Sequence, residues 1–121
     1  MAINVTFKNK GDILLVTASG KDESLEDVEE YGMKVIEQGI LSNCRKILCD
    51  EINLEYNLST IDTFESAKFI SENAPKVCKV ALVSNPKNLP DAKFWETVTF
   101  NRGLTVKVFT DKSEAEVWLK L

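Results

Sequence analysis

Short apolar runs alternate with segments of helical spacing along most of this chain, and this alternation constrains the fold more than any other feature. Five runs are typical of strands: residues 2–8, 13–19, 46–52, 77–83 and 104–109. Four segments carry apolar residues three and four positions apart, which is typical of helices with one buried face: residues 24–40, 59–74, 89–101 and 111–119. The order β-β-α-β-α-β-α-β-α predicts an α/β protein with a largely parallel sheet and right-handed crossovers.

The first two runs are the exception to the parallel order. Ile3, Val5 and Phe7 alternate with polar residues, which predicts a half-buried strand. The turn signal at residues 9–12 is short enough to join this strand to the next one as a hairpin. We therefore expect a five-stranded mostly parallel sheet with an antiparallel N-terminal edge hairpin and about four helices. No linker, repeat or low-complexity tract interrupts the pattern, so residues 1–121 are expected to form a single domain.

Charge and hydropathy argue against two classes of function. The chain has 15 basic and 19 acidic residues and a net charge of -4, whereas a nucleic-acid-binding protein typically shows a basic patch or stripe. No apolar run reaches the length of about 18 residues that a membrane span needs. The first residues lack the basic and apolar regions of a secretory leader. We therefore predict a cytoplasmic protein that binds no nucleic acid.

The chain contains no histidine, and this removes many forms of catalysis. A Ser-His-Asp triad, a Cys-His pair and a histidine general base are all excluded. Cys44, Cys49 and Cys78 form no CxxC pair, so a structural zinc site is not expected. Neither a GxGxxG nor a P-loop signature is present, so a nucleotide cofactor is not expected. The sequence therefore predicts a protein that is not an enzyme and has no cofactor.

Acidic residues follow the centre of the third predicted strand. In parallel sheets, sites gather beyond the carboxyl ends of the strands, and Asp50 and Glu51 lie there. A carboxylate at this place can hold a metal ion or accept a phosphoryl group, or it can cap nearby backbone amides. We favour the capping role for Asp50, because a phosphoacceptor domain needs further carboxylates after its first strand, which here ends in Lys8 and Asn9.

Ser59 stands directly before the second helical segment. A serine at this position accepts a hydrogen bond from the amide three residues further on, here that of Asp62. The same geometry favours a phosphate, because free amides and the helix dipole attract negative charge. A phosphate on Ser59 would add charge beside Asp62 and repel an acidic partner surface. Both roles stay open at this point: a helix cap and a phosphorylation switch.

Four stretches carry a resemblance to a known family. They are Ile47–Asp50, Leu58–Asp62, Phe94–Gly103 and Val108–Leu119. Together with the element order, they make nearly all of the chain resemble the STAS domain of anti-sigma factor antagonists. It is similar in particular to the SpoIIAA-like (STAS/SEC14-like) group of small bacterial proteins. The resemblance implies a non-catalytic regulatory or interaction domain that binds a protein partner in bacterial signalling.

In antagonists of this family, a serine in an Asp-Ser-Ser/Thr-Gly motif is phosphorylated by a partner kinase, and the dephosphorylated form sequesters that kinase. The matching stretch here is Leu58-Ser59-Thr60-Ile61, which keeps the serine and replaces the flanking Asp and Gly. The resemblance thus implies Ser59 and Thr60 as candidate phosphoacceptors and an anti-sigma factor-like kinase as the partner. The candidate partner surface comprises Asp50, Glu51, Tyr56, Asn57, Leu58 and Asp62.

Two alternatives remain beside the protein partner. The SEC14-like side of the resemblance implies a pocket for a small apolar, lipid-like ligand between a helix and the sheet. Five aromatic residues are candidates to line this pocket or an interface: Phe64, Phe69, Phe94, Trp95 and Phe100. Helical spacing of aromatic residues is equally typical of an ordinary core. Phe69 and Phe94 fall off the inner stripes of their helices, so an exposed patch that forms a homodimer is the second alternative.

Overall fold

The computed structural model describes residues 3–121, which form one five-stranded sheet with the order β1-β2-β3-β4-β5. The strands are β1 (Ile3–Lys10), β2 (Ile13–Asp22), β3 (Lys46–Tyr56), β4 (Lys79–Ser84) and β5 (Thr105–Phe109). β1 is antiparallel to β2, and the other three neighbouring pairs are parallel. This confirms the predicted parallel sheet with an antiparallel edge hairpin. The predicted start of the first strand at Ala2 lies outside the described residues.

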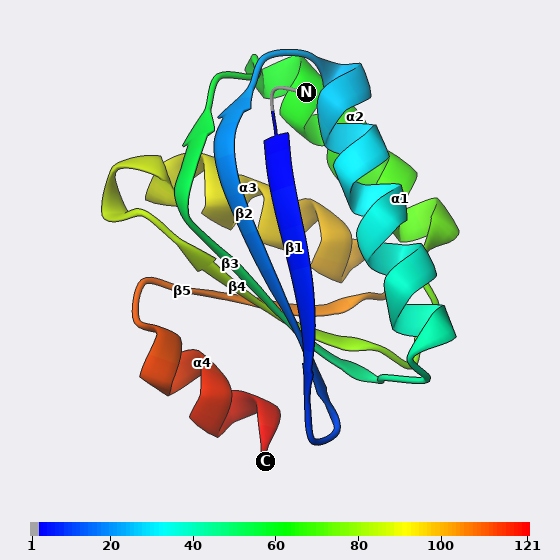
Figure 1. Cartoon of the computed structure of the whole chain (residues 1–121). Helices are drawn as coiled ribbons and strands as arrows, with labels where there is room; N and C mark the ends of the chain where they lie inside the picture. Colours follow the sequence, from blue (N-terminus) through cyan, green and yellow to red (C-terminus); the bar gives the residue numbers. More distant parts are fainter. Residues whose placement is uncertain (1–2) are drawn as a thin grey trace.

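In residues 3–121, three α-helices and one short 3-10 helix connect the strands, and a fourth α-helix follows the last strand. They are α1 (Leu25–Leu41), α2 (Thr60–Asn73), η1 (Pro86–Asn88), α3 (Leu89–Asn101) and α4 (Lys112–Leu119). The strands follow one another in chain order, so crossovers of constant hand place α1, α2 and α3 on one face of the sheet. α4 follows the last strand and packs against the other face (Figure 1). None of the helices in the described chain has the length and apolar composition that crossing a bilayer requires.

The starts of three helices are set by side-chain caps, of which the sequence predicted the one at Ser59. Ser24 accepts a hydrogen bond from the amide of Asp27 at 3.2 Å, and Ser59 accepts one from Asp62 at 3.1 Å. Asp111 caps α4 in the same way, through the amide of Ser113. Each cap gives a partner to an amide that the first turn of a helix leaves unpaired.

Two apolar clusters fill the space on the two faces of the sheet. The larger one lies under α1, α2 and α3 and includes Leu14, Val16 and Tyr31. The smaller one lies under α4 and includes Leu48, Val83 and Leu119. Neighbouring residues of one strand belong to different clusters, as Ile13 and Leu14 of β2 do. The central strands are therefore apolar on both faces, as is usual for a covered parallel sheet.

β3 continues beyond its predicted end at residue 52 as far as Tyr56. β4 ends opposite Glu51, so the last part of β3 pairs with β2 alone. Side chains from the segment after β4 take the place of the missing strand. The amide nitrogens of Asn85 and Asn88 donate to backbone carbonyls of this part of β3, at 3.3 and 3.0 Å. These contacts satisfy backbone groups that would otherwise lack partners.

Candidate functional site

A β-bulge in β3 sets the geometry of the candidate site. Thr17 of β2 faces Asp50, but Ser19 faces Asn53, so β3 contains one more residue than β2 over this stretch. The side chain of Asp50 accepts a hydrogen bond from the amide of Ile52 at 3.3 Å, inside the bulge. The backbone-capping role that the sequence favoured for Asp50 is therefore confirmed.

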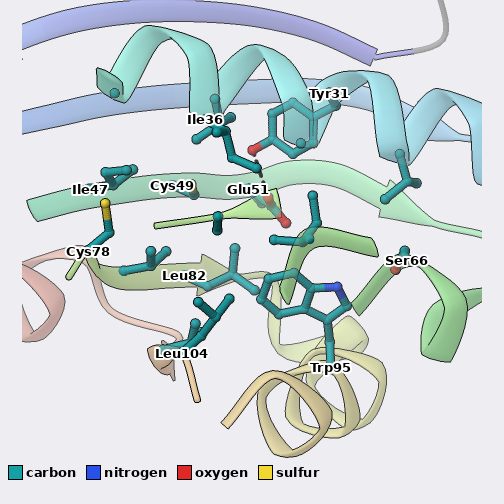
Figure 2. A pocket seen from close by; sticks show the side chains of 18 of the residues that line it. Tyr31, Ile36, Ile47, Cys49, Glu51, Ser66, Cys78, Leu82, Trp95 and Leu104 are labelled. Carbon is teal, nitrogen blue, oxygen red and sulfur yellow. Dashed lines mark hydrogen bonds between the residues drawn. The ribbon is translucent and has the colours of Figure 1, made fainter. Parts of the chain in front are cut away.

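The bulge brings Glu51 and Tyr56 onto the same face of the sheet. Side chains alternate along a strand, so two residues five positions apart normally point to opposite faces. The extra residue reverses this parity, and the hydroxyl of Tyr56 donates a hydrogen bond to Glu51 Oε1. Tyr31 of α1 points to the same carboxylate and donates to Glu51 Oε2 at 2.7 Å (Figure 2). We call Tyr31, Glu51 and Tyr56 the Glu51 cluster.

Burial changes the acid–base behaviour of the Glu51 cluster. Glu51 is only 6% exposed. Loss of hydration raises the pKa of Glu51 from 4.5 to about 7, although the two tyrosine hydrogen bonds lower it. The negative charges of Asp22 and Asp50 act in the same direction as burial. Burial and the neighbouring carboxylate also raise the pKa of both tyrosines, so the hydroxyls of Tyr31 and Tyr56 stay protonated at neutral pH.

A second buried carboxylate lies near the Glu51 cluster. Asp22 ends β2, is 6% exposed and accepts a hydrogen bond from the backbone amide of Asn57. Burial raises the pKa of Asp22 to about 6, against the effect of hydrogen bonds from the amides of Asn57 and Leu58. The buried Asp22 carboxylate therefore holds the backbone of the segment that leads into Ser59, through its hydrogen bond with Asn57.

A cavity of about 350 Å³ lies between the sheet and the three helices α1, α2 and α3. Its walls are mainly apolar and come from every element around it, as Figure 2 shows for Ile36, Leu82 and Trp95. All three members of the Glu51 cluster and Asp22 also line it. The cavity thus combines an apolar interior with buried acidic groups at one end. Within the described residues, no group of three or more His, Cys, Asp or Glu side chains is arranged to hold a metal ion.

The start of α2 presents the predicted phosphoacceptors to solvent. Ser59 and Thr60 are exposed, and Ile61 is 74% exposed. The helix-capping role of Ser59 is confirmed by the hydrogen bond from Asp62, and its phosphorylation stays a prediction. Asn57 is exposed too, so these residues form one accessible surface beside the first turn of α2.

The structure corrects part of the predicted partner surface. Glu51 is buried in the cavity and is not available at the surface. The hydroxyl of Tyr56 points inward to Glu51, and Leu58 lines the cavity. The physical reason is that β3 continues through a bulge to Tyr56, beyond its predicted end at residue 52, and turns Glu51 and Tyr56 toward the interior. Asn57 is exposed, and Asp50, Tyr56, Leu58 and Asp62 are half-buried, so the place of these five residues in a partner surface stays a prediction.

Of the five aromatic candidates, only Trp95 is among the residues that line the cavity. Phe64 instead lies under the guanidinium of Arg102, 5.6 Å from its ring centre, and Phe69 is half-buried. Phe94 is 37% exposed and Phe100 is 67% exposed. From α2, the cavity is lined by Thr63, Ser66 and Ile70 instead of the phenylalanines of this helix. A homodimer formed through Phe69 and Phe94 stays a prediction.

Sequence reasoning missed two residues of the site, Tyr31 and Asp22. A signal for Tyr31 was present, because it lies three residues after Val28 and four before Val35, on the buried face of α1. Asp22 had no such signal, since it belongs to a polar stretch that is typical of a turn. Only the extension of β2 through this stretch brings the Asp22 carboxylate into the interior.

Comparisons with known proteins define the fold. No protein-family model and no curated protein matches the sequence. The crystal structure of an anti-sigma factor antagonist from Mycobacterium paratuberculosis matches with a TM-score of 0.69 and 10% identity, over 98% of this chain and 95% of that one. An uncharacterised protein with a SpoIIAA-like fold from Shewanella loihica matches with a TM-score of 0.56 and 21% identity, over 98% and 94%. The chain therefore has the STAS/SpoIIAA-like fold that its sequence predicted.

Proposed function

We propose that this chain is a non-catalytic regulatory domain that binds a protein partner at the start of α2, under the control of phosphorylation at Ser59. The observation that carries the proposal is the exposed Ser59 side chain at the N-terminus of a helix. We call Asn57, Ser59, Thr60, Ile61 and Asp62 the α2 surface. A solved structure of the same fold is that of an anti-sigma factor antagonist, which supports a protein as the partner.

The α2 surface has the properties that such a switch needs. Ile61 is 74% exposed and offers an apolar contact beside the hydroxyls of Ser59 and Thr60. A phosphate on Ser59 adds a charge of about −1.5 to −2 at neutral pH. The amides of the first turn of α2 stabilise this charge, so the helix is expected to stay folded. The added charge lies beside Asp62 and repels a partner surface that is itself acidic.

The proposal is tested first by mass spectrometry of the protein purified from its own organism in several growth conditions. We expect a phosphate that maps to Ser59 or Thr60. A protein without phosphate in every condition would contradict the switch. The cytoplasmic location and the kinase-like nature of the partner stay predictions.

A second experiment tests the partner surface with matched variants. The wild-type protein and Ser59→Ala are expected to retain the same partner in affinity purification, and Ser59→Asp is expected to lose it. Ser113→Asp is the control, because Ser113 is also exposed in the first turn of a helix but lies on α4, at the other face of the sheet. Loss of the partner in both aspartate variants, or in neither, would refute the assignment of the surface.

A further inference from the structure

The cavity under α1, α2 and α3 is larger than the voids of an ordinary core. Protein interiors are close-packed, and few of their voids exceed the size of a water molecule. A volume of about 350 Å³ lies within the range of pockets that bind small molecules. The mainly apolar walls, with Ile36, Leu82 and Trp95 among them, match the body of an apolar ligand (Figure 2).

The charge of the cavity is unbalanced at one end. Among the described residues, no Lys or Arg forms an ion pair with Glu51 or Asp22. The hydrogen-bond donors to these carboxylates are the tyrosine hydroxyls and backbone amides, which are neutral. Burying a carboxylate without a cation is costly, and a cation brought by a ligand would relieve that cost.

The protein's own cation among the lining residues is too distant to balance these carboxylates. Among the described residues that line the cavity, Arg45 is the one with a basic side chain, and it lies just before the start of β3. Glu51 lies six positions further along the strand, which corresponds to about 20 Å between the two Cα atoms. At this separation Arg45 forms no ion pair with Glu51 or Asp22. The acidic end therefore keeps its negative potential when Glu51 and Asp22 are ionised.

We propose that the cavity binds an apolar molecule with one basic nitrogen, whose ammonium group contacts Glu51 and Asp22. Each carboxylate oxygen can accept more than one hydrogen bond, so Glu51 can accept from an ammonium while it keeps both tyrosine partners. A fatty acid would bring a further negative charge to this end of the cavity. A neutral alcohol would leave the buried carboxylates without a counter-charge. The amine is thus favoured over both, independently of the α2 surface.

Three probes of equal chain length test the ligand class on the wild-type protein: octylamine, octanol and octanoate. Binding is measured by isothermal titration calorimetry at about pH 8, where Glu51 is largely ionised and the amine is protonated. We expect octylamine to bind at least about tenfold more tightly than octanol, the gain typical of a hydrogen bond to a charged group. Octanoate is expected to bind more weakly than either. Equal or tighter binding of octanol or octanoate would overturn the proposal, and so would the absence of binding by all three.

A variant of Glu51 tests the position of the amine. Glu51→Gln keeps the shape of the side chain and removes its charge, so the preference for octylamine over octanol is expected to fall several-fold while octanol binding is unchanged. Glu37→Gln is the control, because Glu37 is exposed on α1 and does not line the cavity. Circular dichroism verifies that both variants are folded. An undiminished preference in a folded Glu51→Gln variant would refute the placement of the ammonium group.

Discussion

Replacing Glu51 with glutamine should change how the free energy of unfolding depends on pH. The pKa of Glu51 is raised in the folded protein from 4.5 to about 7, so the folded state binds a proton more tightly than the unfolded state does. Below the unfolded pKa, the contribution of Glu51 to the unfolding free energy therefore does not change with pH. The unfolding free energy then falls as the pH rises from about 4.5 through about 7. At about 1.36 kcal/mol per pH unit, the loss attributable to Glu51 is about 3 kcal/mol.

Urea unfolding at a series of pH values from about 4 to about 8 measures this effect. The two tryptophans, Trp95 and Trp118, provide the fluorescence signal. Other groups titrate in the same range, Asp22 above all, since burial raises its pKa to about 6. The informative quantity is therefore the difference in unfolding free energy between Glu51→Gln and the wild type at each pH. This difference is expected to grow by about 3 kcal/mol in favour of the variant as the pH rises.

A difference that stays flat with pH would refute the reasoning. It would mean that Glu51 has the same pKa in the folded and the unfolded protein, and that the Tyr31 and Tyr56 hydrogen bonds fully compensate for its burial. Glu37→Gln again serves as the control, and its unfolding free energy should follow the wild type at every pH. Adding octylamine should reduce the pH dependence of the wild type, because the ammonium group stabilises the ionised form of Glu51.

Three further predictions concern local contacts. Ser59→Ala should lower the unfolding free energy in urea by about 1 kcal/mol, because the amide of Asp62 loses its cap. Gly32→Ala should lower it by about 1 kcal/mol or less, since an added Cβ would lie 2.1 Å from Ile70 Cδ1 and displace it, while the better helix propensity of alanine offsets part of the cost, and Ile70→Val in the same chain should remove the clash. Cys49 should resist iodoacetamide in the native protein, because burial raises the pKa of its thiol. Rapid labelling of Cys49 would contradict its burial. An unchanged unfolding free energy in Ser59→Ala or in Gly32→Ala would contradict the contact that the substitution tests.

The mostly parallel sheet and the order of the elements along the chain could be predicted from the sequence because each element carries its own local signal. The alternation of Ile3, Val5 and Phe7 indicates a half-buried strand; in the structure Ile3 is buried, and Val5 and Phe7 are half-buried and pack against the core. Ser24 and Ser59 mark helix starts through bonds to an amide three residues away. Such signals depend only on neighbours along the chain, and the sequence contains them completely.

The candidate site could not be predicted because it depends on contacts between distant segments. Asp50, Glu51 and Ile52 have no pattern that distinguishes a bulge from the start of a loop. The bulge forms because β2 and the asparagines after β4 hold both sides of β3. The cavity is equally hidden, since it results from the combined volumes of side chains from three helices and the sheet. Small residues such as Gly32 and Ser66 leave this space, yet each alone is ordinary in a helix.

The single extra residue in β3 also restricts how this chain can change during evolution. Deleting it would turn Tyr56 away from Glu51 and leave the carboxylate with one tyrosine partner instead of two. Adding a second residue would have the same effect, because orientation along a strand depends on whether the number of residues is odd or even. Insertions and deletions between Glu51 and Tyr56 should therefore occur in pairs among descendants that keep the cluster. Homologues that retain the site can then be recognised from the length of this one segment, even where the residues around it have diverged.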